Sequence, residues 1–115
     1  MELLTHEQRE QLLANGRANA GREDTTDFKP VVKLFCPWSL AVWLLTELDP
    51  ENPDIAFGLC DLGMGFPELG NVSLAELASI RGPGGLCIER DLHFTAIKTL
   101  SAYARDARAL RRIKT

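Results

Sequence analysis

Two apolar segments separated by a proline-containing turn dominate the hydrophobic pattern of the chain. Residues 42–48 and 55–62 are rich in side chains that suit a pleated, half-buried sheet. The sequence Asp-Pro-Glu-Asn-Pro-Asp lies between them, and a central strand would not tolerate its two prolines. The pattern therefore predicts a β-hairpin at the centre of the fold.

Two capping-box sequences predict the starts of two helices. Thr5 is followed three residues later by Gln8, and this first helix is expected to end at Gly16, which can take the left-handed conformation that closes a helix. Ser73 is followed by Glu76, and the glycine-rich segment 82–85 is expected to end the second helix.

Three further segments have the composition of strands. Residues 31–35 lie between two prolines, residues 68–72 follow a glycine-rich turn, and residues 86–94 are rich in apolar side chains. Together with the hairpin, these segments predict about five strands, joined mostly by short turns that favour antiparallel pairing.

The last segment shows the clearest helical periodicity. Its apolar stripe recurs at intervals of three and four and consists of Leu100, Tyr103, Ala107 and Leu110. The stripe is expected to cover alternate residues of the hairpin, which are Trp43, Leu45, Phe57 and Leu59. The order of elements predicts one α+β domain over residues 1–115, with a largely antiparallel sheet and helices packed on one face.

Length and composition are those of one globular domain. The 115 residues are 45% hydrophobic and 25% charged. The longest apolar run, residues 40–45, is too short to span a membrane, and the N-terminal segment lacks the features of a secretory signal. The three cysteines show no Cys-x-x-Cys spacing and are expected to be free, buried thiols. These features predict a cytoplasmic protein.

Charge is unevenly distributed along the chain. Residues 47–91 contain nine acidic residues and two arginines, whereas residues 99–115 contain five basic residues and one aspartate. Such segments are often solvated surfaces, but they can also bind a protein partner of opposite charge. Nucleic-acid binding is weakly supported, because the basic helix lacks interleaved aromatic residues and the net charge is −3. The candidate binding residues are Asp49, Glu51, Asp54, Arg105, Arg108, Arg111 and Arg112.

An enzymatic interpretation places five side chains around one divalent metal ion. Glu89, Asp91 and His93 occupy alternate positions of a predicted strand and so would share one face. Asp61 and Glu68 flank a glycine-rich turn. Oxygen ligands with one imidazole suit Mg²⁺ or Mn²⁺ and metal-assisted phosphodiester hydrolysis. The alternative is that these residues lie apart on solvated surfaces.

The sequence contains no motif that names a reaction. It has no Gly-x-Ser-x-Gly nucleophile elbow, and its glycine-rich segments lack the spacing of phosphate-binding loops. No cofactor is therefore expected.

Several segments carry a family resemblance. They include Val-Val-Lys-Leu-Phe, Trp-Leu-Leu-Thr-Glu-Leu-Asp-Pro, Ala-Phe-Gly-Leu-Cys-Asp-Leu-Gly-Met-Gly-Phe-Pro-Glu-Leu-Gly, Val-Ser-Leu-Ala-Glu-Leu and Glu-Arg-Asp-Leu-His-Phe. Over nearly its whole length the chain resembles a bacterial family known only as domain of unknown function 2958. That family tends to occur on conjugative plasmids and integrative elements, so the resemblance implies a cytoplasmic accessory protein of mobile DNA. It implies no catalytic residues.

Two hypotheses about function follow. The first is a non-catalytic factor of a mobile genetic element that binds a protein partner and inhibits or regulates host defence or DNA processing. It rests on the resemblance and on the acidic middle of the chain. The alternative is a divalent-metal-dependent phosphodiesterase or nuclease that uses the acidic cluster.

Overall fold

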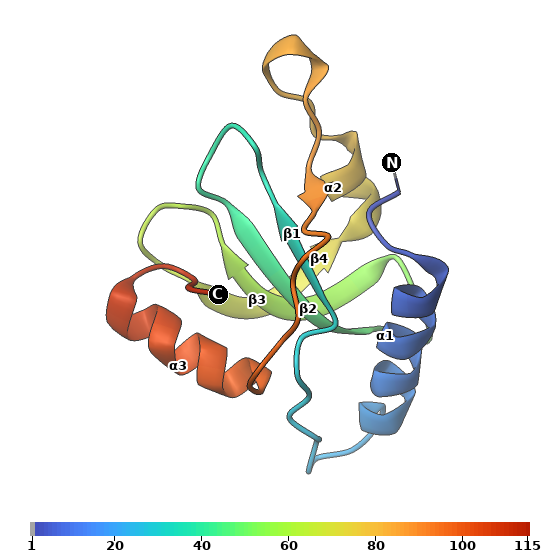
Figure 1. Cartoon of the computed structure of the whole chain (residues 1–115). Helices are drawn as coiled ribbons and strands as arrows, with labels where there is room; N and C mark the ends of the chain where they lie inside the picture. The colour runs from blue at the N-terminus through green and yellow to red at the C-terminus, as the bar shows by residue number, and fades with distance from the viewer. Residues whose placement is uncertain (1) are drawn as a thin grey trace.

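Five antiparallel strands form one open sheet in the order β4-β3-β2-β1-β5 (Figure 1). This computed structural model describes residues 2–115. The strands are β1 (Val32–Phe35), β2 (Val42–Leu48), β3 (Ile55–Asp61), β4 (Glu68–Ser73) and β5 (Glu89–Arg90). The helices are α1 (His6–Asn19), α2 (Leu74–Ser79), a 3-10 turn η1 (Pro83–Gly85) and α3 (Leu100–Leu110). The predicted α+β class, the central hairpin and the antiparallel sheet are confirmed.

Helices cover both faces of the sheet, because side chains of β2 point alternately to two separate cores. Trp43 and Leu45 belong to a first core, which includes Leu12 of α1 and Leu77 of α2. Leu44 belongs to a second core, which is completed by α3. Figure 1 shows α1 and α3 on opposite sides of the sheet. The arrangement therefore differs from the expectation that all helices pack on one face.

The residues predicted to form one core are divided in the same way. Trp43 and Leu45 face α1 and α2, whereas Phe57 and Leu59 face α3. Leu110, the last residue of the predicted stripe, is 46% exposed. The hairpin is thus buried on both sides, which explains why its strands are apolar at nearly every position.

A β-bulge in β2 keeps the first core continuous. The register with β3 shifts between Leu45 and Glu47, so that Leu48 lies opposite Ala56 and returns to the face of Leu45. Asn15 of α1 donates a hydrogen bond from Nδ2 to the carbonyl oxygen of Thr46, at 2.8 Å. The side chain of a helix thereby binds a carbonyl group at the bulge.

The α1 helix begins as predicted but does not end at Gly16. Reciprocal 3.0 Å hydrogen bonds between Thr5 and Gln8 confirm the capping box. The helix continues to Asn19, and Gly16 is buried within it. A Cβ atom at position 16 would lie 1.8 Å from the carbonyl oxygen of Leu48. Gly16 therefore allows α1 to approach β2 closely, and it does not close the helix.

The fifth strand is much shorter than predicted. Only Glu89 and Arg90 pair with β1, whereas the predicted strand covers residues 86–94. The chain turns directly afterwards, and Asp91 accepts a hydrogen bond at Oδ1 from the amide of His93. Alternation of apolar residues in this segment therefore does not reflect a continuous strand.

The three cysteines differ in how far they are buried. Cys36 is buried, Cys60 is half-buried and Cys87 is exposed. Desolvation raises the pKa of the Cys60 thiol. The expectation of three buried thiols is wrong for Cys87.

None of the helices in residues 2–115 has the length and apolar character that a membrane crossing requires.

We expect the substitution Gly16→Ala to destabilise the protein by about 2 kcal/mol or more, because the added methyl group would overlap a backbone carbonyl. Alanine has the higher helix propensity, by about 1 kcal/mol, so propensity alone predicts the opposite sign. Urea denaturation measures the change. Ala14→Gly, at an exposed position of α1, is the matched control and should cost only about 1 kcal/mol. Equal or greater stability of Gly16→Ala would contradict the close approach.

Candidate protein-binding face

The acidic residues proposed as metal ligands are not gathered at one point. Glu68 lies on β4 and Glu89 lies on β5, which are opposite edges of the sheet. Asp61 and Asp91 line one cavity of about 540 Å³, but there Asp91 Oδ2 is 3.5 Å from the ammonium group of Lys33. Within residues 2–115, no group of three or more His, Cys, Asp or Glu side chains is placed to hold a metal ion.

Asp61 is instead a buried structural carboxylate. Its Oδ1 atom accepts a hydrogen bond from the amide of Gly63 at 2.8 Å, and Oδ2 accepts one from the amide of Ile113 at 2.9 Å. The residue is only 2% exposed. Hydrogen bonds to a carboxylate are stronger than neutral ones. Asp61 thus ties both the β3–β4 loop and the segment after α3 to the end of β3.

The acidic turn between β2 and β3 is partly used within the fold. Asp54 accepts hydrogen bonds from the hydroxyl group of Ser73 and the amide of Ala75, so it caps the start of α2. The hydrogen bond from Ser73 lowers the pKa of the Asp54 carboxyl group. Asp49 accepts a bond from the amide of Glu51, and both side chains remain exposed. Asp49 and Glu51 are therefore the turn residues still available to a partner.

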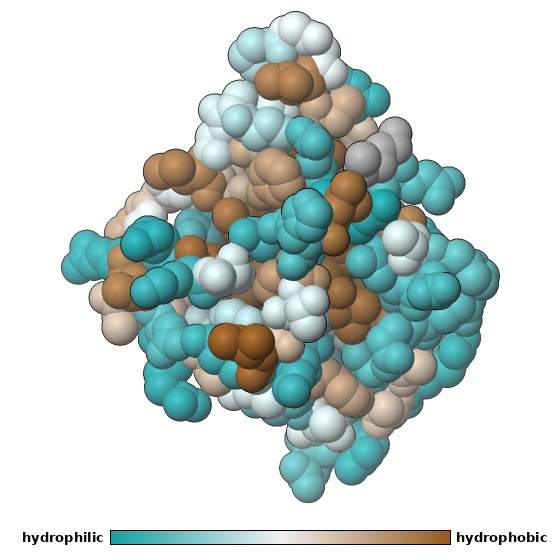
Figure 2. All heavy atoms as spheres, viewed as in Figure 1, coloured by the Kyte–Doolittle hydropathy of each residue, from teal (hydrophilic) through white to brown (hydrophobic). Residues whose placement is uncertain are grey.

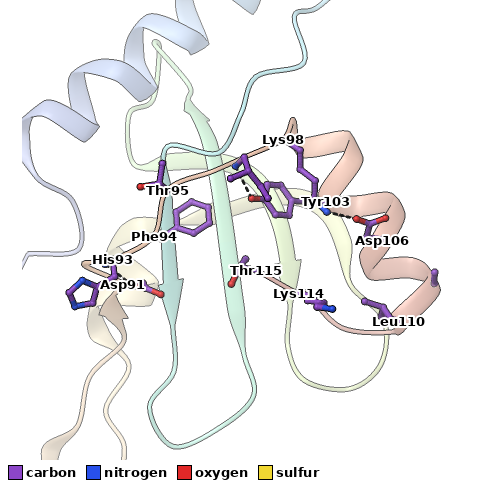
Figure 3. Close-up of a pocket in the computed structure, with 12 residues that line it drawn as sticks. Asp91, His93, Phe94, Thr95, Lys98, Tyr103, Asp106, Leu110, Lys114 and Thr115 are labelled. Atoms are coloured by element: carbon purple, nitrogen blue, oxygen red, sulfur yellow. Dashed lines mark hydrogen bonds and ion pairs between the residues drawn. The ribbon is translucent and has the colours of Figure 1, made fainter.

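A cavity of about 640 Å³ lies between α3 and the segment that precedes it (Figure 3). The Lys98 ammonium group is 4.7 Å from the centre of the Tyr103 ring and forms an ion pair with Asp106. The hydrogen bond from Lys98 lowers the pKa of Asp106. The hydroxyl oxygen of Tyr103 accepts a bond from the amide of Ile97. The polar groups of Lys98, Tyr103 and Asp106 therefore bind one another or the backbone, and they hold the start of α3 against the segment before it.

Four large apolar side chains are exposed at the end of the sheet where β2 begins and β3 ends. Leu40 is 78% exposed in the β1–β2 loop, and Leu62, Met64 and Phe66 are 57%, 70% and 74% exposed in the β3–β4 loop. The two loops touch, since a Cβ atom at Gly63 would lie 3.0 Å from that of Leu40. Figure 2 shows apolar residues over these loops, on the left of the view.

The glycines of the β3–β4 loop explain this exposure. Gly63 and Gly65 have φ values of +80° and +87°, which side chains other than glycine rarely adopt. The glycines alternate with Leu62, Met64 and Phe66, so the loop turns tightly while its apolar side chains project outward. The Asp61 hydrogen bond holds the base of the loop at Gly63.

The C-terminal end of α3 brings arginines to the same region. Arg108 and Arg111 line a cavity of about 560 Å³ with Phe66. Arg111 and Arg112 line the cavity that also contains Leu40. No ion pair in the described part of the chain involves any of these arginines. We call the whole set the loop-end face; it consists of Leu40, Leu62, Met64, Phe66, Arg108, Arg111 and Arg112.

The structure separates the two sets of charged residues proposed as binding sites. Asp49 and Glu51 lie in the turn at one end of the hairpin, and Arg111 and Arg112 lie near the other end. Arg105 lies nearer the middle of α3. Sequence reasoning missed the apolar half of the loop-end face. The available signal was three large apolar residues at alternate positions of a Gly/Pro turn, where polar residues are usual.

Comparison with known proteins identifies the family. The chain matches the family described as "Protein of unknown function (DUF2958)" over residues 3–114, and it belongs to that family. No curated protein and no solved structure matches the chain.

We expect Asp61→Ala to cost about 2–4 kcal/mol, because the amides of Gly63 and Ile113 lose a charged, buried acceptor. The amide of Ile113 should also exchange its hydrogen faster. Thermal or urea unfolding and amide hydrogen exchange measure these effects. Asp49→Ala removes an exposed carboxylate that binds one amide and should cost less than about 1 kcal/mol. Similar losses in the two variants would contradict the anchoring role of Asp61.

Proposed function

We propose that this member of the DUF2958 family is a non-catalytic factor that binds a protein partner through its loop-end face. The observation that supports the proposal most directly is the exposure of Leu40, Met64 and Phe66 at one end of the sheet. Contiguous apolar side chains rimmed by polar ones are typical of protein interaction sites. Their burial against a partner would release ordered water and stabilise the complex.

The composition of the face also suits a protein interface. Aromatic residues, methionine and arginine are enriched at such interfaces, and the loop-end face contains Phe66, Met64 and three arginines. The Asp61 hydrogen bonds and the tight glycine turn restrict the loop before binding. A restrained loop loses less conformational entropy when a partner binds, which favours affinity.

The biological setting of the proposal comes from the family resemblance. A protein of conjugative plasmids or integrative elements would meet host defence proteins and the proteins that process DNA. We propose that the partner belongs to one of these two groups and that binding inhibits or regulates it. The nuclease alternative has less support, because Glu68 and Glu89 lie at opposite sheet edges and Asp61 is occupied by two amides.

Quantitative affinity capture tests the proposal. The wild-type protein, immobilised at low density, is compared with the double variant Met64→Ser, Phe66→Ser. Both are incubated with extracts of a host that carries the proposed plasmid or integrative element. Both residues are exposed, so the variant should fold normally. A specific partner should be recovered at least tenfold less by the double variant, because each lost apolar contact weakens binding by roughly 1–2 kcal/mol.

Leu92→Ser is the matched control, since Leu92 is 67% exposed and lies after β5, outside the loop-end face. It should recover the partner as the wild-type protein does. Charge reversal of Asp49 and Glu51 tests the acidic turn in the same assay. Equal recovery by the wild-type protein and the double variant would contradict a role for the loop-end face.

A further inference from the structure

The outer edge of β4 is free to accept another strand. β4 pairs with β3 and lies at the end of the sheet order, and its register runs without a shift from Ile55–Ser73 to Cys60–Glu68. Edge strands are commonly protected by lysine, proline or a bulge. β4 has none of these within residues 68–73, and Glu68 is its one charged residue. It is therefore a regular and unprotected edge.

The hydrogen-bond pattern identifies the free backbone groups. The amide of Leu74 donates to the carbonyl oxygen of Asp54 at 2.8 Å, so these two residues form a hydrogen-bonded pair at the start of the β3–β4 ladder. Bonded and non-bonded pairs alternate in an antiparallel ladder. Val72, Gly70 and Glu68 therefore bond to β3. Their neighbours Leu69 and Asn71 direct their backbone N–H and C=O groups outward.

One face beside this edge is basic and apolar. Leu69 lies opposite Leu59, which belongs to the core covered by α3, so Leu69 and Asn71 are on the α3 face. Leu69, which is partly exposed, lines a cavity together with Arg108 and Arg111. Glu68 lies opposite Cys60, on the other face of the sheet from Leu69, because adjacent residues of a strand alternate. It nevertheless lines the same cavity at the end of the strand, so this cavity contains one carboxylate and two arginines.

Among the described residues, Arg105 and Arg108 of α3 form no ion pair, although carboxylates lie nearby. The positive charge of Arg105 acts on Asp27 and Asp106, and Glu68 lines the same cavity as Arg108. Asp106 is paired with Lys98 on the side of the helix that lines the cavity of Figure 3. Arg105 and Arg108, three residues apart, share one side of α3. Across the described residues, neither arginine forms an ion pair or donates a side-chain hydrogen bond to the chain. A carboxylate on an added strand would give these arginines a direct ion-pair partner.

We propose that β4 accepts an extended acidic segment of a protein partner as a sixth strand. This inference rests on the proposed protein-binding function and names its mode and partner chemistry. Backbone groups of the segment pair with those of Leu69 and Asn71, and its acidic side chains on the α3 face lie near Arg105 and Arg108. Main-chain bonds supply affinity, and the opposite charges supply specificity.

A second copy of the chain is a poorer occupant of the same edge. Two β4 edges would pair antiparallel about a two-fold axis, which places both α3 helices on the same face of the joined sheet. Arg105 and Arg108 of one copy would then face the same residues of the other copy. Like charges across an interface disfavour it. An acidic partner removes this repulsion.

Synthetic peptides provide the test. A capped seven-residue peptide that alternates glutamate with valine places all its glutamates on one face, and a lysine–valine peptide is its matched control. Binding to the 115-residue protein is measured by fluorescence anisotropy, and hydrogen exchange reports on the amides of Leu69 and Asn71. The glutamate peptide should bind at least tenfold more tightly than the lysine peptide and should protect both amides.

Two kinds of variant separate the backbone and charge contributions. Asn71→Pro removes an outward N–H without removing a bond to β3, and it should weaken glutamate-peptide binding at least tenfold. The double variant Arg105→Glu, Arg108→Glu should reverse the preference between the two peptides. Arg17→Glu, at an exposed position of α1, changes the net charge elsewhere and should bind like the wild-type protein.

Several outcomes would overturn the inference. Equal binding of the two peptides, or unchanged binding by Asn71→Pro, would show that the edge does not select an acidic strand. Displacement of the peptide by a single-stranded oligonucleotide at similar concentration would indicate a nucleic-acid site. A dimer in sedimentation that Asn71→Pro abolishes would indicate that a second copy occupies the edge. Affinity capture distinguishes this failure from failure of the proposed function. A partner that is lost with Met64→Ser, Phe66→Ser but retained by Asn71→Pro would overturn the β4 inference alone.

Discussion

A single buried carboxylate, that of Asp61, joins the parts of the molecule from which the loop-end face is built. One carboxylate oxygen accepts a hydrogen bond from a backbone amide of the β3–β4 loop, at a nitrogen–oxygen distance of 2.8 Å. The other accepts one from a backbone amide in the segment after α3, at 2.9 Å. These segments are 50 residues apart in sequence and belong to different elements. The apolar loop and the arginines at the end of α3 are thereby fixed at the same end of the sheet. The proposed function depends on this arrangement, because neither set of residues alone makes a mixed apolar and basic surface.

The rest of the fold supports that end by burying the hairpin on both faces. Leu44 and Leu45 point to different cores, and the bulge near Thr46 returns Leu48 to the first core. The sheet can thus hold α1 on one side and α3 on the other. Since α3 packs mainly over β3, it leaves the face of β4 uncovered near Leu69. The same packing therefore creates both the stable centre and the accessible edge.

Features with local causes could be predicted from the sequence, and features that depend on distant segments could not. The Thr5–Gln8 capping box and the stripe of α3 need only neighbouring residues. The role of Gly16 depends on a carbonyl group 32 residues away, so a glycine that allows close packing looked like a helix end. Glu68 and Glu89 belong to a common cluster only if their strands are neighbours, and the sheet order separates them. The arginines were identified from charge, but the apolar loop residues were not, because glycines and proline indicated an ordinary turn.

The most direct test of the central claim is site-specific photo-crosslinking in the cells that produce the protein. A photoreactive amino acid replaces Met64 on the loop-end face, and in a second protein it replaces Glu51 in the acidic turn at the other end of the hairpin. Both positions are exposed, so neither substitution should disturb folding. We expect a specific protein adduct from position 64 and none from position 51. Adducts from position 51 alone, or from neither position, would contradict the account.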